Sequence, residues 1–229
     1  CLRLSEIRFD KRKAVGILQI GIPSAFQYSL FAFANLFVQS SVNSFDHVLV
    51  EGNSAAANAD PLVYDMMAAF YTACSSFIAQ NFGARKKKRI LQTYLICLFY
   101  SFITSLVLGV GIYLARYPFL YLFTSDKAVV EAGITRLSIM ALSYSASAFM
   151  DASIAASRGL GKTAVPTFVV VMGSCVFRII WIYTIFAYFH TIQSLYILYV
   201  FSWGITAIAE NIYFFHVYRH TLTEKKELC

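Results

Sequence analysis

Charged residues inside apolar sequence are the residues of this chain best suited to chemistry. Asp151, Arg178 and Glu210 each lie within a long apolar run. In hydrocarbon a charged side chain costs about 3 kcal/mol even on lenient scales, so it pairs, binds or faces water. We interpret Asp151 as a candidate for proton or cation coupling, because a carboxylate in a dry site can take up a proton or hold a cation. For Arg178 and Glu210 we expect intramembrane charge pairing, either with one another or with other groups that tie helices together.

A stripe of carboxamides occupies the first apolar run. Gln27, Asn35, Gln39 and Asn43 follow one another at spacings of 8, 4 and 4 residues, which keeps them near one face of a helix. In lipid such a face must turn towards protein or water. Two interpretations remain open, namely hydrogen bonding between helices and the wall of a solute cavity. Pro23 lies in the same run and permits a bend.

The stretch GLGKT, at 159–163, resembles a nucleotide-binding loop, but it lacks one of the glycines that such a loop requires. A phosphate-binding loop has a glycine five positions before the glycine of Gly-Lys-Thr, and that position is Ala156. We therefore interpret Arg158 and Lys162 as the cations of a short turn between two helices.

Enzyme and metal signatures are missing from the sequence. No HExxH motif, Ser-His-Asp order or glycine-rich cofactor loop occurs. His216 and His220 are four residues apart but lack a third ligand nearby. We predict a protein that is not an enzyme, with no metal and no cofactor apart from a coupling ion.

The composition indicates a membrane protein. Hydrophobic residues make up 59% of the 229 residues and charged residues 14%, and the mean hydropathy is +0.62. The net charge of +7 comes from short basic clusters between apolar runs, which suits membrane topology and excludes a nucleic-acid partner. The cysteines show neither pairing nor metal-ligand spacing.

Six segments are long and apolar enough to cross a bilayer, which takes about 20 residues. The stretch RYPFLYLF is apolar but short, and we interpret it as an interfacial piece rather than a seventh span. The sequence therefore predicts an all-α transmembrane fold with a six-helix bundle. The predicted spans are 14–43, 61–82, 90–115, 134–157, 164–189 and 192–217.

The distribution of basic residues predicts the orientation. Fifteen of the nineteen lysine and arginine residues lie in the first thirteen residues, at 85–89, at Arg158 and Lys162, or after position 218. With six spans these four clusters share one side, so both termini are predicted to be cytoplasmic. We divide the chain into a cytoplasmic linker at 1–13, a transmembrane lobe at 14–218 and a cytoplasmic tail at 219–229.

Four motifs resemble the multidrug and toxic compound extrusion (MATE) family of secondary transporters. They are GIPSAFQ in the first span, AQNFGARKKKR after the second, SRGLGKTAVP after the fourth and CVFRIIWIY in the fifth. Their order matches the second half of that family and extends over about 14–218. The resemblance implies one lobe of a twelve-helix transporter with two lobes, here the C-terminal lobe, joined in the same protein to an N-terminal six-helix lobe.

The resemblance also implies an activity. Members export cationic lipophilic compounds in exchange for Na⁺ or H⁺ by alternating access, as multi-pass proteins of the bacterial inner membrane. Partners would be membrane lipids and small cationic substrates. One branch of the family has a glutamate where this chain has Gln27, and an aspartate at the position of Ser147, one turn before Asp151.

Two alternative functions remain open at this stage. A lipid or precursor flippase would use the same architecture with an amphipathic cargo. A membrane scaffold without transport would use the carboxamide stripe only to join helices.

Overall fold

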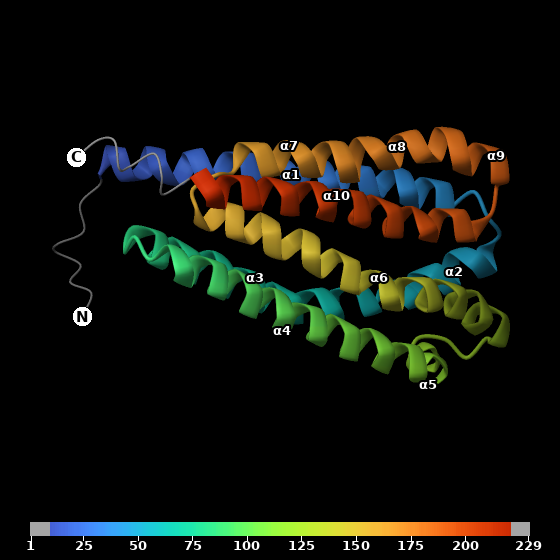
Figure 1. Ribbon diagram of the computed structural model, residues 1–229. Coiled ribbons are helices and arrows are strands. Elements are labelled where there is room, and N and C mark those ends of the chain that lie inside the picture. Colours follow the sequence, from blue (N-terminus) through green and yellow to red (C-terminus); the bar gives the residue numbers. More distant parts are fainter. Residues whose placement is uncertain (1–9, 221–229) are drawn as a thin grey trace.

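The computed structural model describes residues 10–220, and within them the regular secondary structure is helical, without strands. In this range six helical spans are long and apolar enough to cross a membrane (Figure 1). The predicted linker at 1–13 and tail at 219–229 lie largely outside the described residues. The spans are α1 (Lys11–Val42), α2 (His47–Ala57) with α3 (Ala59–Gly83), α4 (Lys87–Leu114), α6 (Lys127–Gly159), α7 to α9 (Ala164–Phe189) and α10 (Ile192–His220).

The segment before the second span differs from the sequence expectation. We expected a loop around 44–60, but most of it forms α2, which continues the span at its outer end. Asp46 begins this helix by accepting a hydrogen bond from the backbone N–H of Leu49 at 2.9 Å. The RYPFLYLF stretch forms only the short helix α5 (Arg116–Tyr121), so it is not a seventh span.

The fifth span is not a uniform α-helix. It consists of α7 (Ala164–Val170), η2 (Val171–Val176), α8 (Phe177–Trp181), η3 (Ile182–Phe186) and α9 (Ala187–Phe189), where η2 and η3 are π-helical. Such insertions widen a helix, change the direction of its side chains and often occur at functional sites. No sequence pattern predicted them.

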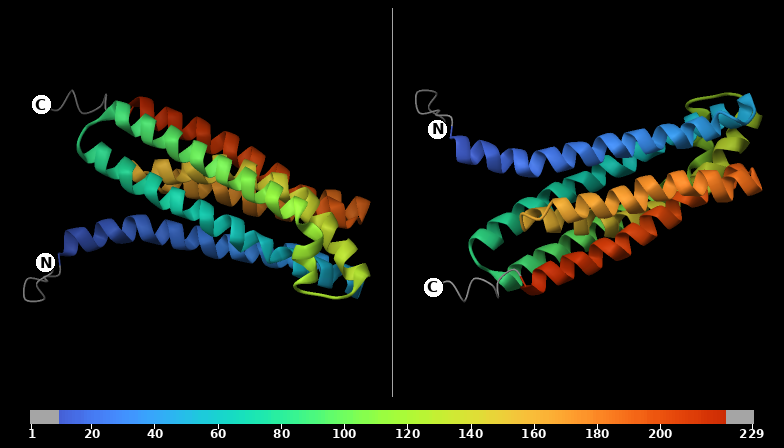
Figure 2. Two further views of the ribbon diagram at one scale, coloured as in Figure 1. Left: turned by 90° about the horizontal axis from the view of Figure 1, so that it is seen from below. Right: turned by 90° about the horizontal axis from the view of Figure 1, so that it is seen from above.

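The bundle is built around α6. This helix packs against α2, α3, α4, α5 and α10. In its most apolar 18-residue stretch 67% of the residues are buried, whereas in the corresponding stretch of α1 only 12% are. By contrast, α1 packs mainly on the fifth span and has no extensive contact with α3 or α6. Figure 2 shows the first half of α1 standing apart from α3, while the two helices approach each other near α2.

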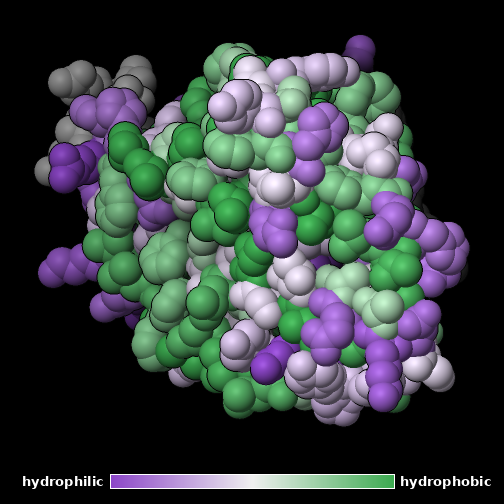
Figure 3. Space-filling view, turned by 90° about the vertical axis from the view of Figure 1, so that its right-hand side faces the viewer, coloured by the Kyte–Doolittle hydropathy of each residue, from purple (hydrophilic) through white to green (hydrophobic). Residues whose placement is uncertain are grey.

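The two ends of the bundle differ in charge. The start of α1, the end of α10, the basic α3–α4 turn and the α6–α7 turn lie at one end (Figure 1), as an even number of spans requires. The surface at the other end is a mixture of hydrophilic and hydrophobic side chains (Figure 3).

Glycines allow α4 and α6 to approach closely. A Cβ atom at Gly109 would lie 2.2 Å from the backbone oxygen of Ala141. We expect Gly109→Val to destabilise the protein by about 1–3 kcal/mol, because a backbone atom cannot move aside without shifting the helix. Thermal unfolding of the purified protein in detergent measures this effect.

The matched control is Gly111→Val on the same helix, since a Cβ atom at Gly111 would have no neighbour within 4 Å. Equal melting temperatures for the two variants would contradict the close approach of α4 and α6.

Candidate functional site

A cavity of about 550 Å³ opens between α1 and the wall formed by α2, α3 and α6. Aromatic and methionine side chains make up much of its surface, together with a few carboxamide, carboxylate and guanidinium groups, a mixture typical of sites for amphipathic organic molecules. The lining residues are Gln27, Tyr28, Phe31, Asn35, Val38, Gln39 and Val42 of α1; Asn53, Ala57, Asp60, Pro61, Tyr64, Met67 and Tyr71 of α2 and α3; Arg136, Met140, Tyr144, Ser147, Met150, Asp151, Ile154, Ala155 and Arg158 of α6; and Val170, Tyr196, Tyr199 and Trp203.

The structure places most of the carboxamide stripe on this cavity. Gln27, Asn35 and Gln39 line it, whereas Asn43 does not. Asn43 instead accepts a hydrogen bond from Nε2 of Gln39 at 2.9 Å. Gln27 and Asn35 are also bonded to arginines of other helices, so they join helices and form the cavity wall at once. Their role in binding cargo remains a prediction.

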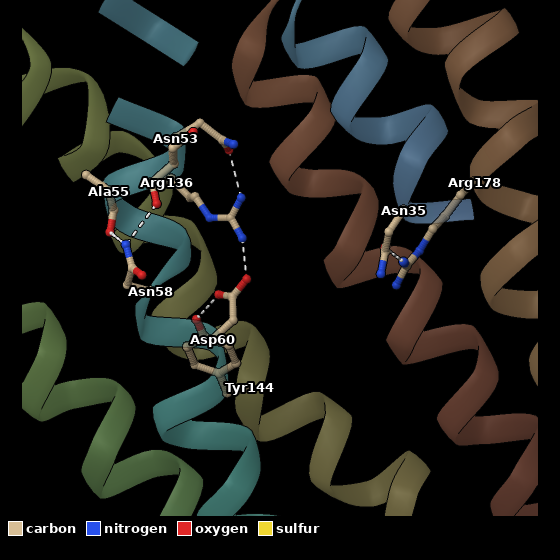
Figure 4. Close-up of polar contacts among 9 residues, drawn as sticks. Asn35, Asn53, Ala55, Asn58, Asp60, Arg136, Tyr144 and Arg178 are labelled. Carbon is tan, nitrogen blue, oxygen red and sulfur yellow. Dashed lines mark hydrogen bonds and ion pairs between the residues drawn. The ribbon is translucent and has the colours of Figure 1, made fainter. Parts of the chain in front are cut away.

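A polar network on one side of the cavity was missed by sequence reasoning (Figure 4). Arg136 of α6 donates from Nη1 to Oδ1 of Asn53 at 2.7 Å and forms an ion pair with Asp60. The hydroxyl of Tyr144 donates to Oδ1 of Asp60 at 2.5 Å. Arg136 lies at the start of the predicted span 134–157, but α6 begins seven residues earlier, at Lys127, and the side chain is buried. The only available signal was the spacing of eight between Arg136 and Tyr144, which places both on one helical face.

Arg178 lies on the opposite side, in α8 (Figure 4). Its side chain is fully buried. Nη1 donates to Oδ1 of Asn35 at 2.7 Å, and the guanidinium carbon lies 4.6 Å and 4.5 Å from the ring centroids of Phe31 and Tyr199. Two aromatic faces and a carboxamide therefore stabilise this cation.

For Arg178, the structure decides between the two kinds of partner that the sequence left open. Arg178 is paired with Asn35, and neither carboxylate oxygen of the fully buried Glu210 has a hydrogen-bond partner in residues 10–220. Eight residues, about 12 Å along α10, separate Glu210 from Ser202, the α10 residue that Arg178 reaches.

Asp151 is half-buried and lines the cavity on α6, one turn after Ser147. Arg158 of the same helix interacts electrostatically with it. Nη2 of Arg158 also donates to Oε1 of Gln27 at 3.0 Å, and this bond links α6 to α1. The carboxylate thus has access to the cavity and a cation within range, which suits reversible binding of a proton or cation. Across residues 10–220, no group of three histidine, cysteine, aspartate or glutamate side chains is arranged to hold a metal ion.

Comparison with known proteins identifies the family. A model of the MatE family, the multidrug and toxic compound extrusion transporters, matches residues 23–184. The chain belongs to this family. No curated protein matches the sequence significantly. MatE proteins are membrane transporters, a family that in general does not consist of enzymes.

Solved structures show the same fold. A MATE transporter mutant from Vibrio cholerae is 17% identical with a TM-score of 0.83, and the match covers 96% of this chain and 50% of that one. A MOP superfamily transporter from Pyrococcus furiosus is 19% identical with a TM-score of 0.85, covering 98% and 50%. An outward-facing multidrug resistance MATE transporter is 19% identical with a TM-score of 0.84, covering 99% and 50%. The chain thus spans about half the length of these structures, which corresponds to one six-helix lobe.

Proposed function

We propose that this chain is the C-terminal lobe of a cation-coupled exporter of lipophilic organic compounds. The single observation that carries the proposal is the cavity between α1 and α6, in which polar groups and aromatic rings share one surface. Together with an N-terminal lobe of the same protein it would form a central cavity, open to one side of the membrane at a time. By the family resemblance the cargo is cationic and the coupling ion is Na⁺ or H⁺.

The loosely packed α1 is suited to the movement that alternating access requires. Pro23 provides no backbone N–H, so the carbonyl of Gln19 lacks the usual donor four residues further along the helix. The hydroxyl of Thr163 lies 3.5 Å from that carbonyl, and the hydroxyl of Thr167 lies 3.5 Å from the carbonyl of Pro23. These contacts support α1 where it can bend, and its shift would widen or narrow the cavity.

Orientation and location are part of the same proposal. The basic turns share an end with the described ends of α1 and α10 (Figure 1). This arrangement supports cytoplasmic termini and a multi-pass protein of the bacterial inner membrane.

Transport by the full-length protein in proteoliposomes tests the function. We expect accumulation of a fluorescent lipophilic cation when a Na⁺ or pH gradient is imposed, and none without a gradient. Movement of labelled lipid under the same gradients, without movement of the cation, would assign a flippase. Inertness towards both cargoes and both gradients would overturn the proposal and favour a scaffold.

A further inference from the structure

The charged groups that line the cavity do not give it the net negative charge that a site for a simple cation would have. Among the described residues, two acids and two bases line it: Asp60, Asp151, Arg136 and Arg158. Asp60 is already bound by Arg136 and Tyr144, and Asp151 has Arg158 within electrostatic range. Each cavity carboxylate thus has an arginine as partner or neighbour, and Arg178 is an additional buried positive charge.

Arg178 lies directly behind the cavity wall. Its three nearest partners on that side, Asn35, Phe31 and Tyr199, all line the cavity. Within residues 10–220 no carboxylate pairs with this guanidinium, and its Nη2 atom has no hydrogen-bond partner. A guanidinium stays charged in proteins, whereas a buried carboxyl such as Glu210 can become neutral by taking a proton. An unpaired N–H group on a permanent buried cation is costly, and an anionic oxygen is the partner that offsets it best.

The backbone around Arg178 supports a binding role as well. The π-helical segments η2 and η3 directly flank the five residues of α8. On the other side of Arg178, the hydroxyl of Ser202 lies 3.4 Å from Nε and donates to the carbonyl of Gly173 in η2 at 3.2 Å. Ser202 therefore holds Nε, and Asn35, which lines the cavity, is the partner of Nη1 that a ligand can replace.

We propose that Arg178 is a specificity-determining residue that recognises an acidic group of the cargo. The preferred cargo is then a zwitterionic amphiphile, in which a lipophilic cation also carries a carboxylate or a similar anionic group. This inference rests on the proposed transport function and names the chemical class of its cargo. In binding, the acidic group replaces Asn35 at the guanidinium, and the lipophilic body contacts the aromatic rings that line the cavity.

Binding of two matched dyes to the full-length protein in nanodiscs of zwitterionic lipid tests the proposal. Rhodamine 110 carries a free carboxyl group, and rhodamine 123 is its methyl ester, so the pair differs only at the acid. We expect the free acid to bind more tightly by about tenfold or more, the usual value of a hydrogen bond to a charged partner. Equal binding, or tighter binding of the ester, would overturn the proposal without any variant being needed.

Variants assign the preference to Arg178. In Arg178→Gln we expect the two dyes to bind equally, with affinity for the ester unchanged, and in Arg178→Lys we expect part of the preference to return. The matched comparison is Arg116→Gln, which removes an arginine of α5 that does not line the cavity and should leave the preference intact. A preference that survives in Arg178→Gln, or that is lost in Arg116→Gln as well, would contradict the assignment.

Two further outcomes distinguish an acidic group of the cargo from a lipid headgroup, and the cargo preference from the transport function on which it rests. Loss of the preference on adding anionic lipid would assign the Arg178 position to a lipid headgroup and overturn recognition of cargo. Gradient-driven export of the ester with no preference for the acid would leave the transport function standing and refute only this inference. Failure of both dyes to bind or move would refute the transport function itself, and the inference with it.

Discussion

Replacing Asp151 by asparagine is expected to abolish gradient-driven transport while leaving cargo binding nearly intact. Asparagine keeps the size and hydrogen-bonding capacity of the side chain, but it can neither exchange a proton nor attract a cation. Among residues 10–220, Asp151 is the cavity carboxylate that no ion pair occupies, whereas Asp60 is held by Arg136 and Tyr144. We expect gradient-driven uptake by the full-length protein to fall by about tenfold or more, towards the rate without a gradient.

The same proteoliposome assay, combined with quenching of Trp203 fluorescence by cargo, separates coupling from binding. Trp203 lines the cavity and reports cargo there directly. The matched control is Asp65→Asn, an exposed aspartate of α3 outside the cavity, for which we expect normal uptake. Export that remains fully dependent on the gradient in Asp151→Asn would remove Asp151 from the mechanism.

Removing the carboxylate of Asp60 is expected to give a large loss of stability. Asp60→Ala leaves the buried guanidinium of Arg136 with only Asn53 as a hydrogen-bonding partner among the described residues, and an uncompensated buried charge is strongly unfavourable. It also removes the acceptor of the Tyr144 hydroxyl. We expect a loss of about 3 kcal/mol, at the lower end for a buried pair because Asp60 is partly open to the cavity.

A double variant shows whether the loss comes from the charge left behind. Asp60→Ala combined with Arg136→Met removes both partners, and we expect it to be more stable than Asp60→Ala alone. Thermal unfolding in detergent provides the comparison, with Asp65→Ala as the exposed control on the same helix. If the double variant is less stable than the single one, the ion pair does not account for the effect.

The sequence alone determined the architecture of this protein. Six apolar segments, each long enough for a bilayer, require helices, because the backbone must satisfy its own hydrogen bonds in lipid. The basic clusters predicted that two turns and both chain ends lie on the same side. In the structure the α3–α4 and α6–α7 turns share one end of the bundle with the start of α1 and the end of α10. A spacing of four or eight residues was also sufficient to place Gln27, Asn35 and Gln39 on one face, and that face lines the cavity.

Only the tertiary structure decided which charged groups meet. Hydropathy and spacing act along one helix, whereas the partner of a buried charge is set by how helices cross and rotate against each other. Thus Arg136 of α6 binds Asp60 from another span, and Arg178 meets Asn35 rather than Glu210. The π-helical segment η2 before Arg178 packs against α1 and α10, and no local sequence pattern predicted it.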